Sequence, residues 1–148
     1  NYEEAARCLA EMLTDFGPSP TILKVLAFEI KLKALVLAYD GKPDFRHNYA
    51  KGWQRLSAPL RKRLIEDATL RFAGHVNFFD MQTILENTRN AFLKYRYDYE
   101  INETRTPQKI EAQSADWDNP DYEFHPLEID GLIEAMDLEL TNWLEAKK

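Results

Sequence analysis

The segment from Ile22 to Tyr39 limits the possible folds of this chain more than any other part of the sequence. It is long enough for about five helical turns and is apolar on almost every side. Glu29, Lys31 and Lys33 nevertheless lie near its middle. A helix with so little polar surface has to be surrounded by other helices. The interspersed charges also exclude a membrane-spanning segment here.

Glu29 and Lys33 are four residues apart, with the acid on the N-terminal side, which is the better order for an ion pair on a helix. Burying ionised side chains costs several kcal/mol unless they are paired. The favoured interpretation is a partly exposed pair on the one solvated edge of a mostly buried helix. The alternative is a polar feature that lines a cleft between helices.

Composition places the chain among single-domain proteins. Its 148 residues are enough for one hydrophobic core. The single cysteine, Cys8, excludes an internal disulfide and a cysteine metal site, as expected in a reducing cytosol. The start of the sequence has no secretory signal pattern, so a cytoplasmic location is expected. The three histidines are scattered and no glycine-rich phosphate loop occurs, so no metal and no cofactor are expected.

The net charge of −6 is unevenly distributed. Residues 1–100 carry 15 basic and 13 acidic side chains, whereas residues 101–148 carry 4 basic and 12 acidic ones. Between Lys42 and Arg71 there are 8 basic residues against 3 acidic ones. The overall acidity therefore does not exclude an anionic partner for the N-terminal two thirds of the chain.

The apolar spacing follows a helical period throughout, which predicts an all-α, up-and-down bundle of about five or six helices in one domain spanning residues 1–148. The expected helix caps are Thr21, Asp44, Ser57 and Asp80. The segment at about 102–126 is expected to be an irregular acidic insertion. The expected helices are Tyr2–Phe16, Ile22–Tyr39, Phe45–Leu56, Ser57–Phe72, Met81–Ile101 and Leu127–Ala146.

Several motifs in residues 22–100 occur together in a fixed order. Glu29 precedes Leu32-Lys33-Ala34-Leu35, then come His47-Asn48-Tyr49 and Leu56-Ser57, and a later helix carries Arg89-Asn90 and the run Tyr95 to Glu100. This set resembles the HEPN (higher eukaryotes and prokaryotes nucleotide-binding) family of helical bundles. The resemblance implies a nucleic-acid- or nucleotide-binding protein, a homodimer, and a bacterial defence, toxin–antitoxin or stress setting.

Ribonucleases of the HEPN type carry an arginine, a polar residue and, a few positions later, a histidine. Here Arg89 and Asn90 supply the first half, but Tyr95 is the nearest candidate for the histidine. A phenol with an ordinary pKa near 10 is a poor general base at neutral pH. A non-catalytic binding role is therefore preferred, and a metal-independent RNase with this degenerate motif is the alternative.

Two groups of residues are candidates for anion binding. Arg89 and Arg96 are seven apart and stack on one side of a helix; with Asn90 they would hold phosphate through planar guanidinium groups, or else only cover the edge of the core. Arg46, His47 and Lys51 are flanking candidates. His47 would contact a phosphate or base, or would instead pack on the bundle.

Two further segments have open interpretations. The triplet Arg61-Lys62-Arg63 is either a solvated helix face or a phosphate-backbone contact. The acidic aromatic segment 115–126 either tucks onto the bundle, covers the basic surface, or makes the chain a protein-interaction module.

Overall fold

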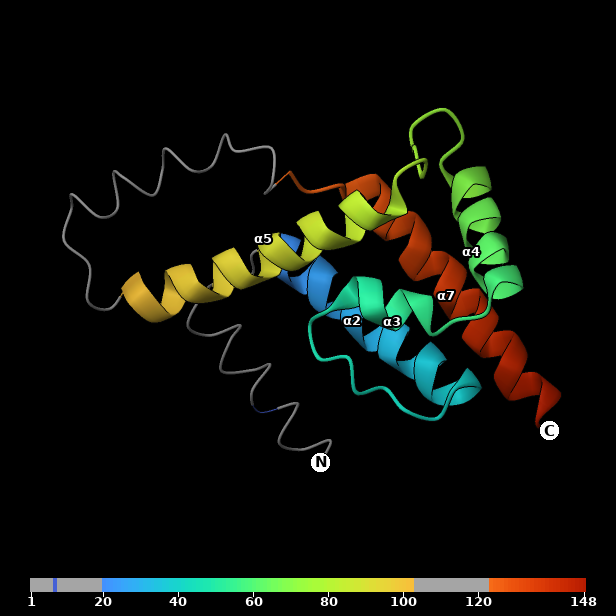
Figure 1. Ribbon diagram of the computed structural model, residues 1–148. Coiled ribbons are helices and arrows are strands. Elements are labelled where there is room, and N and C mark those ends of the chain that lie inside the picture. The colour runs from blue at the N-terminus through green and yellow to red at the C-terminus, as the bar shows by residue number, and fades with distance from the viewer. Residues whose placement is uncertain (1–6, 8–19, 103–122) are drawn as a thin grey trace.

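The structure is a computed structural model that describes residue 7, residues 20–102 and residues 123–148, without the side chains of residue 20 and residues 95–102. These parts of the chain contain helices and no strand, which confirms the all-α prediction. Labels follow Figure 1, and the helices are α2 Pro20–Tyr39, α3 Tyr49–Gln54, α4 Ala58–Arg71, α5 Met81–Asn102 and α7 Pro126–Ala146. The expected helix at Tyr2–Phe16 and most of the acidic insertion lie outside the described residues.

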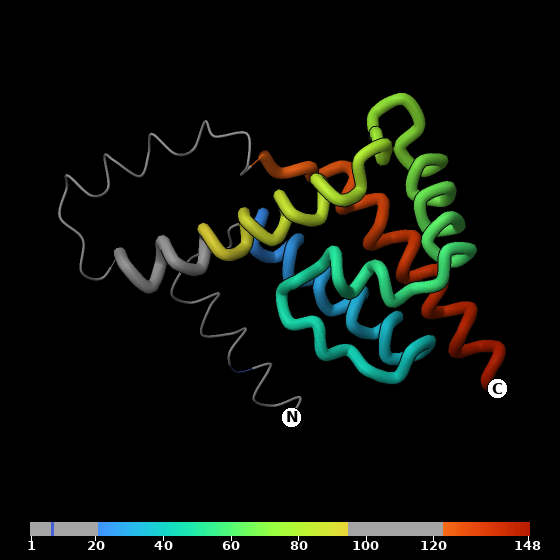
Figure 2. Tube along the Cα trace, in the orientation of Figure 1, coloured from blue at the N-terminus to red at the C-terminus, as the bar shows by residue number. Residues whose placement is uncertain are grey.

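Two interfaces with α7 form the largest part of the core. The helix α7 packs against α2 on one side and against α4 on the other. The short α3 packs against both α2 and α5, and α5 crosses α2 on the side away from α4 (Figures 1 and 2). The fully buried side chains at these contacts include Val25, Phe28, Leu32, Leu35, Tyr49, Leu60, Leu64, Leu85, Ile129, Leu132 and Met136.

The helix α2 is central, as predicted, because it contacts α3, α5 and α7. It is not covered on every side by the described residues, however. Ile30 and Leu37 are 59% and 57% exposed. No helix in the described ranges is long and apolar enough to cross a bilayer.

Helix ends follow local signals in most cases. The Ser57 side chain accepts a hydrogen bond from the Leu60 amide, and Asp80 accepts one from the Thr83 amide, so both predicted caps are confirmed. Gly41 ends α2 with a φ of +78°, a backbone conformation that glycine adopts without steric cost. Thr21 is not a cap, because α2 already begins one residue earlier.

The predicted cap Asp44 is also wrong. Asn48 caps α3 by accepting a hydrogen bond from the Lys51 amide, and α3 begins at Tyr49 rather than Phe45. The Asp44 carboxylate is bound instead by the Arg55 guanidinium. The Asp44 side chain therefore pairs with an arginine eleven residues away instead of capping the helix.

Candidate functional site

A buried carboxylate on α2 organises the polar centre of the molecule. Glu29 is only 6% exposed, yet its two oxygens accept hydrogen bonds from three side chains. Oε1 accepts from Lys33 Nζ at 2.6 Å, and Oε2 accepts from the Tyr49 hydroxyl at 2.7 Å. Oε2 also lies 2.9 Å from His47 Nδ1. We call Glu29, Lys33, His47 and Tyr49 the Glu29 cluster.

The protonation of Glu29 follows from these contacts. Burial by itself raises the pKa of a carboxyl group, but the hydrogen bonds from Lys33, His47 and Tyr49 outweigh it and leave the pKa of Glu29 below its ordinary value. The carboxylate is therefore ionised near neutral pH and can only accept hydrogen bonds. His47 Nδ1 must then carry the proton of that contact, and this determines which ring nitrogen is the donor.

Tyr49 adds a neutral donor to the same cluster. Burial, followed by the negative charge of Glu29, raises the pKa of the Tyr49 phenol well above its ordinary value, and the positive charge of Arg89 partly opposes this. The phenol therefore remains protonated and donates to Glu29 throughout the physiological range.

His47 joins the loop before α3 to α5. Its ring contacts the Phe92 ring with centroids 4.6 Å apart and planes tilted by 39°. The preceding residue, Arg46, has a φ of +53°, a left-handed conformation that costs about 1–3 kcal/mol for a residue with a side chain. The turn leaves Arg46 exposed while its neighbour His47 bonds to the buried Glu29.

The two groups of predicted binding residues lie on segments that this contact joins. Arg89 lies one helical turn before Phe92 on α5 and is exposed, and Arg46 and Lys51 are exposed on either side of His47 in the chain. The half-buried Asn90 follows Arg89. We call Arg46, His47, Lys51 and Arg89 the basic face. The side chains of Tyr95 and Arg96 lie outside the described residues, so the predicted stacking of Arg89 and Arg96 on one side of the helix stays a prediction.

The structure corrects the favoured interpretation of Glu29 and Lys33. Their ion pair is present, and the Lys33 side chain is 36% exposed, but the Glu29 side chain is only 8% exposed. The pair is therefore one arm of a buried network and not an isolated surface pair. Tyr49 was missed as a partner, because twenty residues and a change of direction separate it from Glu29.

The basic triplet on α4 has internal partners. Arg61 donates to Gln54 Oε1 at 2.7 Å, Lys62 lies 3.8 Å from Glu66, and Arg63 lies 2.8 Å from Glu139 on α7. Lys62 and Arg63 are thus exposed residues on a solvated helix face, which is one of the two interpretations of the triplet. No group of three histidine, cysteine or acidic side chains that would suit a metal ion occurs among the described residues.

Comparison of the chain with family models, with curated proteins and with solved structures finds no match. The resemblance to HEPN bundles therefore stays a prediction that rests on the motifs around Glu29, His47 and Arg89.

Proposed function

We propose that this protein is a HEPN-like nucleic-acid- or nucleotide-binding bundle and that the basic face binds the phosphate groups of its ligand. The observation that carries this proposal is the contact of the His47 ring with Phe92. It joins the segment bearing Arg46 and Lys51, the loop before α3 and α3 itself, to the helix bearing Arg89. Cations separated by about forty residues in the sequence thereby lie on segments that are in contact.

The charges of the basic face support an anionic ligand. No carboxylate of the described residues forms an ion pair with Arg46, Lys51 or Arg89. Several basic side chains elsewhere in these ranges do pair with acids, such as Lys24 with Asp130 and Arg71 with Asp67 and Glu134. Exposed cations without a paired acid attract phosphate strongly, because binding releases the counterions that surround a nucleic acid.

The Glu29 cluster gives His47 a supporting role on this face. Because Nδ1 donates to Glu29, the neutral ring has no second N–H for phosphate, so His47 contributes by joining the loop before α3 to α5. Tyr95 is the nearest residue to the position where HEPN-type ribonucleases carry a histidine. We therefore propose binding rather than cleavage.

Fluorescence anisotropy with a short labelled single-stranded RNA, and separately with a labelled nucleotide, tests this proposal. Each phosphate contact contributes a slope of about −0.7 to log K against log salt for a single strand, so three contacts predict about −2. Arg89→Ala should weaken RNA binding about tenfold or more at low salt, as expected for one lost charged contact, and should reduce the slope by about 0.7.

The control is Arg71→Ala, which removes the same charge from a residue that is already paired with two acids. It should change RNA affinity by less than about twofold. A salt-independent affinity, or equal losses for the Arg89 and Arg71 variants, would contradict the proposal.

A further inference from the structure

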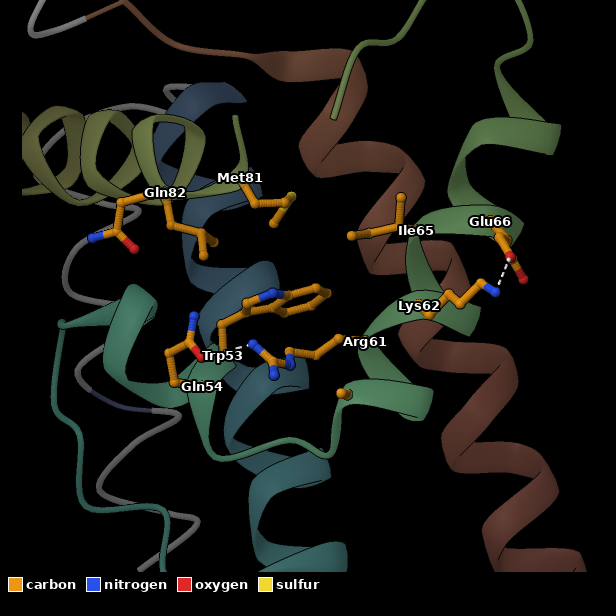
Figure 3. Close-up of a pocket in the computed structure, with 10 residues that line it drawn as sticks. Trp53, Gln54, Arg61, Lys62, Ile65, Glu66, Met81 and Gln82 are labelled. Atoms are coloured by element: carbon orange, nitrogen blue, oxygen red, sulfur yellow. Dashed lines mark hydrogen bonds and ion pairs between the residues drawn. The ribbon is translucent and has the colours of Figure 1, made fainter. Parts of the chain in front are cut away.

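A pocket of about 410 Å³ opens between α3, α4 and the start of α5 (Figure 3), and no residue of the Glu29 cluster lines it. It arises from the way the helices pack. The helix α4 packs mainly on α7, whereas α5 packs on α3 and α2, so α4 and α5 diverge from one another. Trp53 of α3 closes the bottom of the space between them.

The walls of the pocket combine apolar side chains with charged ones, which are Arg61 and the pair of Lys62 with Glu66. Ile65 of α4 and Met81 of α5 point toward the Trp53 ring from opposite sides (Figure 3). Arg61 of α4 lies beside the same ring, with Gln54 next to it (Figure 3). The volume of the pocket is within the range of about 300–1,000 Å³ that is usual for small-molecule sites. Such sites combine apolar walls with a few polar groups.

Arg61 is the unusual member of this lining. It is half-buried, and a hydrogen bond from Nη1 to Gln54 Oε1 at 2.7 Å holds its guanidinium in place. Its Nε atom is buried and has no hydrogen-bond acceptor in the described part of the chain. Its neighbours Lys62 and Arg63 lie beside the carboxylates of Glu66 and Glu139. No carboxylate of the described residues pairs with Arg61. A buried donor without an acceptor is rare in native proteins and calls for an explanation.

We propose that this pocket binds a small organic anion with a flat apolar body, of the class of aromatic carboxylates. The carboxylate would be bound by the Arg61 guanidinium, which presents its donors in a fixed plane that suits two oxygens. The ring would lie against Trp53, Ile65 and Met81, since aromatic and thioether side chains make favourable contacts with aromatic ligands. This site is separate from the basic face, and neither site depends on the other.

The test uses indole-3-acetate as the anionic probe and indole-3-acetamide as its neutral counterpart, titrated into the full chain labelled with ¹⁵N. We expect indole-3-acetate to shift the amide signals of Gln54, Ala58, Arg61 and Gln82 saturably. The neutral amide should bind about tenfold or more weakly, because it lacks the charge that Arg61 recognises. Equal affinities for the two probes, or shifts confined to other residues, would overturn the proposal.

Two variants and a control sharpen the result. Arg61→Gln should weaken binding of indole-3-acetate about tenfold to a hundredfold, whereas the control Arg63→Gln, with the same change of charge outside the pocket, should leave it within about twofold. Ala58→Phe adds a ring to the pocket wall and should abolish binding while Arg61 remains. Retained binding in both Arg61→Gln and Ala58→Phe would exclude this site. RNA affinity should be unchanged in all three proteins, so failure here is distinguishable from failure of the basic face.

Discussion

The charges of α2 fall into two groups that differ in what they do for the fold. On one side, Glu29 is buried and bound by Lys33, His47 and Tyr49. On the other side, Lys24 and Lys31 reach across to Asp130 and Asp137 of α7. The side chains of the second group are 27–51% exposed, against 8% for Glu29. Charged residues on one helix therefore differ in energetic class, and the burial of Glu29 makes the difference.

The physical reason is solvent. Exposed ion pairs gain little because water screens both charges, and their measured contribution is about 0–1 kcal/mol. A buried carboxylate loses its hydration on folding and depends on its protein donors, so removing either side leaves polar groups without partners. The Glu29 cluster is thus expected to determine how α2, α3 and the loop between them fit together. The pairs with α7 are expected to be replaceable.

Glu29→Gln is the strongest test of this difference. The neutral amide has only one acceptor oxygen for three donors, and its NH₂ group faces some of them. We expect a loss of about 2–4 kcal/mol in the free energy of unfolding at pH 7, measured by urea denaturation. The control Glu66→Gln changes an exposed acid that lies 3.8 Å from Lys62, and should cost no more than about 0.5 kcal/mol. Equal losses in the two variants would contradict the distinction.

The pH dependence of the same variant gives a second test. The pKa of Glu29 is lower in the folded protein than its ordinary value of 4.5, so its contribution is complete above pH 4.5 and is lost as the pH falls through the folded pKa. The stability difference between the wild type and Glu29→Gln should therefore narrow steadily below about pH 4.5. Other acids with lowered pKa values, such as Asp44 and Asp80, are shared by both proteins and cancel in the difference. A gap that stays constant down to about pH 3 would mean that the charge of Glu29 is not what stabilises the fold.

Tyr49→Phe should have an intermediate effect. It removes one hydrogen bond to an ionised acceptor and leaves the other two donors in place, which corresponds to a loss of about 1.5 kcal/mol at pH 7. Because the pKa of Tyr49 is raised by folding, this contribution is present below its ordinary value of 10.0 and falls as the pH rises above it. Measured by urea denaturation, the free energies of unfolding of the wild type and Tyr49→Phe should thus become more similar at alkaline pH. A Tyr49→Phe variant as stable as the wild type at pH 7 would show that the hydroxyl is dispensable.

The smallest effect is expected for the double variant Asp130→Asn, Asp137→Asn. It breaks both exposed pairs between α2 and α7, and should cost less than about 1 kcal/mol. Raising the salt concentration should reduce even this difference, because exposed charges are screened over about 10 Å at 0.1 M. Thermal unfolding at low and high salt measures both the loss of stability and its dependence on salt. A loss larger than that of Glu29→Gln would reverse the ranking of the two groups.

Features that depend on a few neighbouring residues could be predicted from the sequence. The caps Ser57 and Asp80 act on amides three residues away, so a side chain and its partner are brought together by one turn of helix. The pair of Glu29 with Lys33 is of the same kind. Asp44 shows the limit of such reasoning, because Arg55, eleven residues further on, binds the carboxylate that was expected to cap α3.

The candidate sites depended on contacts between distant segments. Helical spacing placed Arg89 and Asn90 on α5, and the resemblance to HEPN bundles drew attention to His47. Nothing in the spacing showed that His47 would bond to Glu29 and contact Phe92. The pocket at Trp53 was not predictable either, because its existence depends on the divergence of α4 and α5.

The amino-acid sequence by itself determines the helical character of the chain and the positions of most helix ends. It also determines that Glu29 needs a partner inside an apolar helix. These properties follow from apolar periodicity and from side chains that act within one turn. Tertiary packing, in contrast, makes His47 and Tyr49 the partners of Glu29. It also places Arg61 in the lining of a pocket, where it pairs with no acid of the described residues. These contacts depend on which segments exclude water together, and that is a property of the packed chain rather than of any single stretch of it.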